Sequence, residues 1–147
     1  MINLAFNKRA GFDYMILEKF EAGLVLAGQE VKSIKAGHIS LKESFVVMRN
    51  SEFYLINAHI ARYKHAEEQK SYDPAGPRKL LLKKSEIKHL SGKIQSRGLT
   101  LVPIRVYTKK RLVKLEFGVG KGKKKFDKRA DMAKREDKRK IERFLKS

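Results

Sequence analysis

The sequence predicts a mainly β protein with short helices, built as a small antiparallel barrel of the oligonucleotide-binding type and followed by a basic tail. Five or six β-rich runs and two helical stretches occupy about 110 residues, which suits such a barrel, and connections of hairpin length favour antiparallel pairing. The last 27 residues carry 13 Lys or Arg, 5 Asp or Glu and few apolar side chains, so they cannot extend a core. We therefore expect one domain over residues 1–120 and a separate tail over residues 121–147.

A long strand over residues 13–27 and a short helix over residues 28–36 are the first expected elements. The strand mixes apolar and charged side chains, and Ala22-Gly23 predicts a bend, because glycine inside a strand commonly marks a bend or bulge. Apolar residues at helical spacing indicate the helix. Gly37 is suited to end it, because glycine tolerates the left-handed conformation found after helix C-termini.

Residues 41–49 and 53–62 form the next expected pair of strands. Both runs are rich in β-branched and aromatic residues, and the turn-forming residues 50–52 between them predict a hairpin. Alternation along the second strand divides its side chains between two faces, Tyr54, Ile56, Ala58 and Ile60 against Phe53, Leu55, Asn57 and His59. Residues 64–77 contain turn and breaker residues without periodicity, so we expect a surface loop there.

A second helix and a second hairpin complete the expected barrel. Ser85 is the predicted cap of the helix, which should end at Arg97-Gly98 with basic residues near its C-terminus. Residues 100–108 and 111–119 alternate as strands do and are joined at two lysines, which predicts a hairpin. Pro103 lies within the first of these strands, so we expect a sheet edge or a bulge at that point.

The charge of the chain points to a polyanionic partner. Its 147 residues hold 35 Lys or Arg and 16 Asp or Glu, for a formal net charge of +19 and a pI near 10.2, which makes nucleic acid the leading partner. An anionic membrane surface is the other polyanion, but no run approaches the roughly 20 apolar residues that span a bilayer. The N-terminus lacks the order of a signal peptide, so we expect a cytoplasmic protein with no membrane partner.

Familiar catalytic and metal-binding patterns are missing from the sequence, and we expect neither an enzyme nor a bound cofactor or metal. The chain has no cysteine, and its four histidines lack the spacing of a zinc helix. No serine sits in a Gly-x-Ser-x-Gly elbow, and the glycines at 118–122 lack the Gly-Lys-Ser/Thr of a nucleotide-binding loop. One enzymatic alternative stays open here, a metal-independent nuclease that uses Glu21, Glu30 and His59.

The tail has the composition of an arm that binds RNA. The glycines at 118–122 end the last strand, and they can also let the backbone approach RNA while nearby lysines contact phosphates. Phe126, a single ring among cations, can either stack on an unpaired base or anchor the tail on the barrel. Acid-first charge pairs beyond Lys128 support only a nascent helix. We expect a tail that is disordered alone and helical on RNA.

Several motifs together carry a resemblance to a known family. They are Asn7-Lys8-Arg9-Ala10, Phe20-Glu21-Ala22-Gly23, Gly28-x-Glu30-Val31-Lys32-Ser33, Ala36-Gly37, Asn57-Ala58-His59-Ile60, Arg78-Lys79-Leu80-Leu81-Leu82 and Gly118-x-x-Lys121-Gly122-Lys123-Lys124-x-x-Asp127-Lys128-Arg129. In this order, from about Asn7 to Lys146, they resemble the SsrA-binding protein family, also called small protein B. The match is specific because several independent motifs occur in one order.

The resemblance implies an oligonucleotide-binding-type barrel that binds transfer-messenger RNA and has no chemistry of its own. Members of that family carry the alanyl-charged RNA to ribosomes stalled on messages without a stop codon, where they fill the space of an anticodon stem and codon. The implied partners are transfer-messenger RNA, the decoding centre and message channel of the small subunit and, indirectly, elongation factor Tu and alanyl-tRNA synthetase. A monomer is expected when the protein is free.

The resemblance also implies roles for particular residues. Those expected to bind the tRNA-like domain are Glu21, Leu81 and Lys114, together with Asn7, Lys8, Arg9, Arg78 and Lys79. Those expected at the decoding centre are Lys121, Lys123, Lys124, Phe126, Asp127, Lys128 and Arg129, and those expected in the message channel are Phe144 and Leu145. Leu81 has a core position as its alternative, and Glu21 has an orienting role as its alternative to direct RNA contact. A general single-stranded RNA-binding or ribosomal protein is the rival function.

Overall fold

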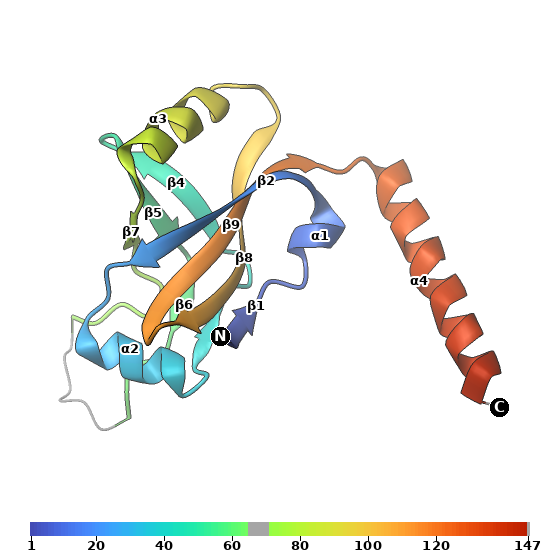
Figure 1. The fold of residues 1–147 in the computed structure, drawn as a ribbon, viewed down its shortest axis with the longest axis horizontal. Coiled ribbons are helices and arrows are strands. Elements are labelled where there is room, and N and C mark those ends of the chain that lie inside the picture. The colour runs from blue at the N-terminus through green and yellow to red at the C-terminus, as the bar shows by residue number, and fades with distance from the viewer. Residues whose placement is uncertain (65–70, 147) are drawn as a thin grey trace.

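The computed structural model of the chain describes residues 1–64 and 71–146, but not the tail side chains of residues 125–127, 130, 131, 142 and 144–146. The elements are, in order, β1 (Ile2–Phe6), α1 (Ala10–Asp13), β2 (Tyr14–Leu24), α2 (Gly28–Lys35), β3 (Ile39–Ser40), β4 (Phe45–Arg49), β5 (Glu52–Ile56), β6 (His59–Ile60), β7 (Arg78–Leu81), α3 (Lys84–Lys93), β8 (Leu99–Lys109), β9 (Leu112–Gly122) and α4 (Lys125–Lys146). Figure 1 shows a barrel from which α4 projects. None of the described helices is long and apolar enough to cross a membrane.

The strands close into an antiparallel barrel. Within the described residues, the pairing runs β2–β9, β9–β8, β8–β4, β4–β5, β5–β7 and β7–β2, which returns to the starting strand. β1 adds to β8 outside this ring, and β3 pairs separately with β6. The predicted antiparallel barrel is therefore confirmed, as is the hairpin expected over residues 100–119.

The interior of the barrel is an apolar cluster that helices cover at both ends. Phe53, Leu55 and Phe117 are at most 1% exposed and belong to this cluster. α2 and α3 lie at opposite ends of the barrel in Figure 1, and they contribute Ile34 and Leu90, each 0% exposed. Full burial of one such side chain contributes about 1.5–3 kcal/mol, so the helices are held chiefly by this packing.

The helices that cover the barrel differ in how well the sequence predicted their ends. α2 stops just before Gly37, whose φ of 86° is left-handed, as expected. α3 starts at Lys84, because the Glu86 carboxylate accepts the backbone N–H of Lys83 at 3.1 Å. The predicted cap, Ser85, is therefore wrong and lies inside the first turn. α3 also ends earlier than predicted, and Gly98, with a φ of 76°, belongs to the turn before β8.

The hairpin of β4 and β5 has the expected tight turn but a shorter second strand. Asn50 and Ser51 have left-handed φ values of 51° and 62°, which suit a two-residue turn between antiparallel strands. The strand predicted to run on without a break is interrupted at Asn57, where φ is 61°. This break shifts the alternation by one residue. Before Asn57 the buried positions are Phe53 and Leu55, and after it they are Ala58 and Ile60.

A bulge in β2 creates a second, smaller apolar cluster, on the outside of the barrel. The register between β2 and β9 shifts between Ile16 and Glu18, and not at the predicted Ala22-Gly23. Ile16 and Tyr14 pack there against the buried residues Ala10, Val102 and Ile104. This cluster holds α1, which the sequence did not predict, on the barrel wall. The alternative of a bulge at Pro103 is confirmed by a register shift between Pro103 and Arg105.

Two glycines of β9 leave the space that this outer cluster fills. A Cβ atom at Gly118 would lie 2.7 Å from Ile16 Cγ2 and 2.8 Å from the backbone oxygen of Glu18. At Gly120 it would lie 3.1 Å from Tyr14 Cβ. Both glycines therefore face protein at close range, whereas the sequence suggested a close approach of RNA to this backbone.

We expect Gly118→Ala to destabilise the protein by about 1–3 kcal/mol, because an added methyl group must displace Ile16 or the backbone of β2. Gly122→Ala is the matched control, since a Cβ atom there meets nothing within 4 Å. Urea unfolding followed by circular dichroism measures both variants. Equal stability of the two would contradict the packing described for Gly118.

Candidate RNA interface

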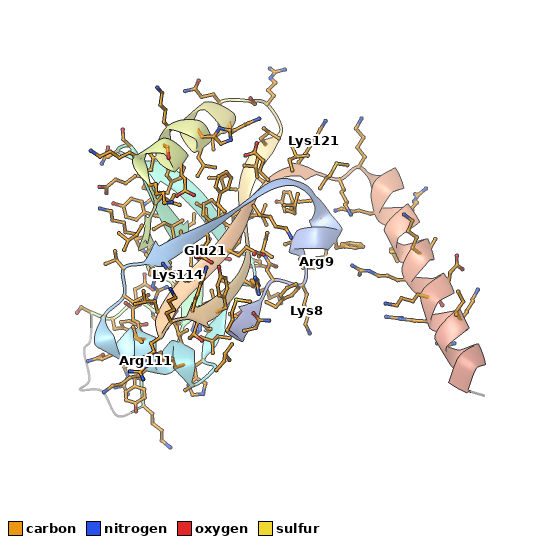
Figure 2. The ribbon with its side chains drawn as sticks, viewed as in Figure 1. Lys8, Arg9, Glu21, Arg111, Lys114 and Lys121 are labelled. Carbon is orange, nitrogen blue, oxygen red and sulfur yellow. The ribbon has the colours of Figure 1, made fainter. Side chains whose placement is uncertain are left out.

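Three residues expected to bind RNA meet on the outer face of the barrel. Glu21 of β2 lies opposite Glu116 of β9, and Lys114, two residues away on β9, lies opposite Gly23 of β2. Gly23 also pairs with Leu81 of β7. Paired residues, and residues two apart on one strand, point to the same side of a sheet, so Glu21, Leu81 and Lys114 share one face. Figure 2 shows Glu21 and Lys114 close together on it.

Leu81 is a surface residue. It is 56% exposed, so it does not take the core position that was the alternative to a place on the RNA-binding surface. With Gly23, Arg111 and Lys114 it lines a shallow cavity of about 250 Å³. A cavity with an apolar wall and cations at its rim can accept a nucleotide, which combines an apolar base face with an anionic phosphate.

Glu21 is held by hydrogen bonds within the protein. The Tyr107 hydroxyl donates to its carboxylate, and the Lys109 ammonium lies 3.5 Å away. The hydrogen bond from Tyr107 is the main cause that lowers the pKa of Glu21 below its usual value, and the charges of Lys109 and Lys114 add to it while burial opposes it. The Glu21 carboxylate is therefore ionised at neutral pH. It already accepts hydrogen bonds from Tyr107 and Lys109, and only its remaining lone pairs can accept hydrogen bonds from RNA.

Arg105 and Tyr107, which sequence reasoning missed, support the face around Glu21. The Arg105 guanidinium lies 4.5 Å from the centroid of the Tyr107 ring, 3.3 Å from the Glu116 carboxylate and 2.9 Å from Asn3 Oδ1. The Tyr107 ring is 2% exposed, so it orders the face and has no free surface on which a base could stack. Burial raises the pKa of Tyr107, and the hydrogen bond to Glu21 raises it further. The sequence offered one sign of this role: Arg105 and Tyr107 are two residues apart on a predicted strand and therefore share one face of it.

Tyr107→Phe should raise the pKa of Glu21 toward its ordinary value, because it removes the hydrogen bond that mainly lowers it. A carboxyl with a lowered pKa stabilises the fold above its unfolded-state pKa, and this stabilisation is lost as pH falls through the folded-state pKa. The variant should therefore lose less stability than the wild type on acidification below about pH 4.

Carbon-13 NMR titration of the Glu21 carboxyl measures this pKa directly. Lys109→Ala is the control and should shift it less, because Lys109 lies 3.5 Å from the carboxylate and makes a smaller contribution. An unchanged pKa in Tyr107→Phe would contradict the hydrogen bond as its cause.

Arg78 was expected to bind RNA, but the structure places it inside the protein. Its side chain is 4% exposed, and its guanidinium lies 2.9 Å from the Glu30 carboxylate and donates to the backbone oxygen of Ala58 at 2.7 Å. This burial contradicts a direct contact of Arg78 with RNA, because its charge and donors are used to fix α2 against the barrel. The neighbouring Lys79 points outward and pairs with Glu52 at 2.9 Å.

Asn7, Lys8 and Arg9 form the entry to α1. The Asn7 side-chain amide donates to the backbone oxygen of Pro103 at 2.8 Å, so it ties this entry to β8. Arg9 lies 3.0 Å from the Asp13 carboxylate and, like Lys8, is exposed. Of the three, only Lys8 and Arg9 present a charge to a ligand.

The end of β9, the short connection after it and the first turns of α4 carry the residues expected at the decoding centre. Lys121 is exposed at the end of β9, and the ammonium of Lys123 donates to the backbone oxygen of Gly11 at 2.8 Å. Lys128 lies 3.2 Å from the Asp13 carboxylate. Two further residues of this set, Lys124 and Arg129, are exposed. The side chains of Phe126, Asp127, Phe144 and Leu145 lie outside the described residues.

The tail backbone is an α-helix over Lys125–Lys146. This is the state expected for it on RNA. The expectation that it is disordered in the free protein is not tested by this helix and stays a prediction.

The described residues also bear on catalytic alternatives. No group of three or more His, Cys, Asp or Glu side chains among them could hold a metal ion. The two carboxylates of the nuclease alternative belong to separate networks, Glu21 with Tyr107 and Glu30 with Arg78. His59, the third member, is an exposed residue of β6.

A closed antiparallel barrel with a basic tail and an exposed face of apolar, acidic and basic side chains is typical of RNA-binding proteins. Comparison with known proteins gives the family. The model of the SmpB protein family matches residues 4–147. SsrA-binding proteins of Alkaliphilus metalliredigens and Thermosynechococcus vestitus are 52% and 48% identical over 143 residues, which cover 97% of this chain and 90% and 94% of theirs. A solved chain described as "tmRNA-SmpB: a journey to the center of the bacterial ribosome" matches with a TM-score of 0.67 and 44% identity over 82% of this chain and 84% of its own. The chain belongs to the SmpB family.

Proposed function

We propose that this chain binds transfer-messenger RNA and delivers it to stalled ribosomes for trans-translation, without catalysing a reaction itself. The observation that carries the proposal is the convergence of Glu21, Leu81 and Lys114 on one exposed face. An apolar side chain, a cation and a fixed carboxylate in one place suit a folded RNA, which offers bases, phosphates and 2′-hydroxyl groups. Membership of a family whose relatives are described as SsrA-binding proteins supports this choice of RNA.

Lys114 is the residue of this face best placed to contact a phosphate. Among the described residues it has no hydrogen-bond or ion-pair partner, whereas Lys109 lies 3.5 Å from Glu21. A cation that forms no ion pair can neutralise a phosphate without first breaking one. Arg111 lines the same cavity and extends the cationic rim.

The proposal gives the tail a separate part of the task. The barrel replaces the missing anticodon arm, the connection from Lys121 to Arg129 reaches the decoding centre, and α4 probes the empty message channel through its end at Phe144 and Leu145. The net charge of +8 on residues 121–147 supports a path along ribosomal RNA. We also propose that the protein acts as a cytoplasmic monomer, and that elongation factor Tu and alanyl-tRNA synthetase act through the RNA it carries.

Lys114→Ala should weaken binding to an isolated tRNA-like domain by about tenfold and reduce the slope of log affinity against log salt by about one, because it removes one phosphate contact. Lys88→Ala, which removes an exposed lysine of α3 that lies outside the candidate face, is the control and should have little effect. Fluorescence anisotropy between about 50 and 200 mM salt measures both, with unrelated tRNA and mRNA as competitors. Equal loss in the two variants, or equal competition by any RNA, would favour general RNA binding instead.

Deletion of residues 131–147 should leave affinity for the tRNA-like domain nearly intact while it abolishes tagging on stalled ribosomes. The reason is that the candidate face lies on β2, β7 and β9, outside the deleted segment. The same anisotropy assay and a reconstituted tagging reaction measure the two effects. Joint loss of binding and tagging would refute the division of the chain into an RNA dock and a ribosome probe.

A further inference from the structure

Phe6 is an aromatic residue of β1 that the barrel leaves exposed. It is 62% exposed, and β1 lies at the edge of the sheet, where β8 is its neighbour. A single exposed apolar residue is common on protein surfaces, so its exposure alone indicates no function. What distinguishes Phe6 is the set of groups that lie beside its ring.

A bulge in β1 turns Phe6 toward the face that carries Glu21. Asn3 pairs with Tyr107 and Phe6 pairs with Arg105, and the register shifts between Asn3 and Ala5. Asn3 and Phe6 are three positions apart, so in a regular strand they would point to opposite sides. Because of the bulge they share one side, and Phe6 lies on the same side of the sheet as Arg105.

Phe6 ends a row of residues that crosses four neighbouring strands. Arg105 of β8 pairs with Glu116 of β9, and Glu116 pairs with Glu21 of β2. Strands lie about 4.8 Å apart, so Phe6 lies about 14 Å along the sheet from Glu21. A few nucleotides of one RNA strand cover such a distance. The exposed ring is therefore continuous with the candidate face around Glu21.

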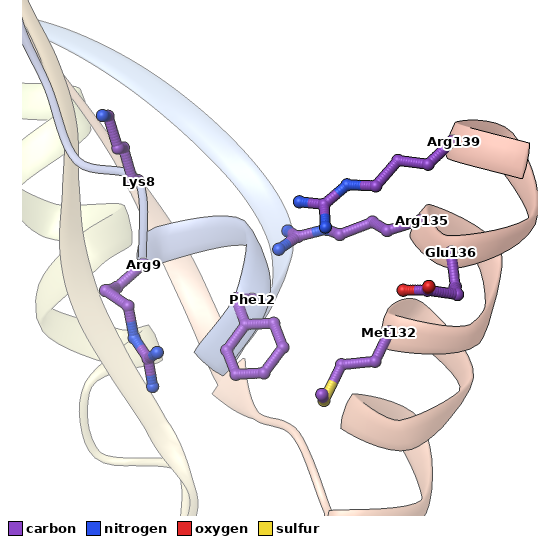
Figure 3. Close-up of a pocket in the computed structure, with 7 residues that line it drawn as sticks. All are labelled: Lys8, Arg9, Phe12, Met132, Arg135, Glu136 and Arg139. Carbon is purple, nitrogen blue, oxygen red and sulfur yellow. The ribbon is translucent and has the colours of Figure 1, made fainter. Parts of the chain in front are cut away.

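The surface beside Phe6 is hollowed and basic. A cavity of about 300 Å³ is lined by Phe6 and by residues of the outer apolar cluster, and its charged lining residues, Lys8, Lys19 and Arg135, are all basic. Arg135 alone comes from the tail, so the barrel and the entry to α1 supply the rest of the lining. Figure 3 shows Lys8 and Arg9 pointing in opposite directions from this entry, and of these two only Lys8 lines the cavity.

The middle of the row is acidic and is flanked by lysines. Lys114 lies two residues before Glu116 on β9, and Lys19 lies two residues before Glu21 on β2, which runs antiparallel to β9. The two lysines therefore lie on opposite sides of the two carboxylates. RNA that crosses the row keeps its phosphates near the lysines and turns 2′-hydroxyl and base amino groups, which donate hydrogen bonds, toward the carboxylates. A base turned toward the sheet in this way can reach the exposed ring.

We propose that Phe6 contacts the bound RNA, with an unpaired base stacked on its ring and Lys8 and Lys19 at the adjacent phosphates. This extends the RNA-binding face from β2, β7 and β9 across β8 to β1. The inference rests on the proposed function, since the RNA is the tRNA-like domain that contacts the face around Glu21. A nucleotide matches both the ring and the cations, whereas a second copy of this chain would bring a like charge of +19.

The test places a tryptophan at Phe6 and at a control position on the same strand. The sequence contains no tryptophan, so Phe6→Trp and Ile2→Trp each carry the only indole of the full-length chain. Ile2 is 65% exposed and pairs with Thr108, next to Tyr107, so it points to the other side of the sheet. Because stacking of a base quenches indole fluorescence, an isolated tRNA-like domain should reduce the emission of Phe6→Trp severalfold and that of Ile2→Trp little.

Affinities separate stacking from charge. Phe6→Leu should weaken binding to the tRNA-like domain about tenfold, and Phe6→Tyr, which keeps the ring, should bind like the parent. The slope of log affinity against log salt should be unchanged in Phe6→Leu, because no phosphate contact is lost, whereas Lys19→Ala should reduce it by about one. Thermal unfolding should be the same in Phe6→Leu and the parent, since the residue is 62% exposed.

Tight binding without quenching in Phe6→Trp, equal quenching in Ile2→Trp, or full affinity in Phe6→Leu would overturn the proposal. So would emission that changes with protein concentration in the absence of RNA, which would show self-association at this surface, or quenching by vacant ribosomes and not by the tRNA-like domain. If the parent chain failed to bind the tRNA-like domain in the anisotropy assay, the proposed function would fall and this extension with it.

Discussion

The organisation of this protein depends on β9, which is hydrogen-bonded along both of its edges. Its residues 114–122 pair with β2 on one side and its residues 112–121 pair with β8 on the other, so it joins the two ends of the sheet within the barrel. The inward side chains of β9, such as Leu115 and Phe117, build the core. Its outward positions are therefore the only ones free for other tasks, and they are divided between two surfaces.

The first half of the outward face of β9 carries side chains and the second half carries none. Lys114 and Glu116 stand beside Glu21 and make the mixed polar face proposed to bind RNA. Gly118 and Gly120 make way for the cluster that seats α1, and the strand then leads into the tail. One strand thus fixes both the RNA-binding face and the start of the tail. The length of that strand sets the distance between the RNA-binding face and the start of the tail.

The sequence predicted the barrel, the hairpins and the family because alternation, turn residues and motif order are local properties. It did not predict the bulge beside Ile16 or the purpose of Gly118, because both arise from contact between strands that lie far apart in the chain. Arg78 was misplaced for a similar reason: a basic residue in a basic protein suggests RNA, and its buried partner Glu30 is 48 residues away. Lys114, by contrast, could be placed on the outer face from strand alternation alone.

The central claim is that RNA meets the face of β2, β7 and β9 while the tail waits for a second site. Amide chemical-shift mapping with substoichiometric tRNA-like RNA at about 200 mM salt, where weak non-specific contacts are screened, tests it most directly. The account predicts shifts that start around Glu21, Leu81 and Lys114, with residues 128–143 of the tail unaffected. Shifts that start in the tail and leave the barrel face unchanged would contradict it.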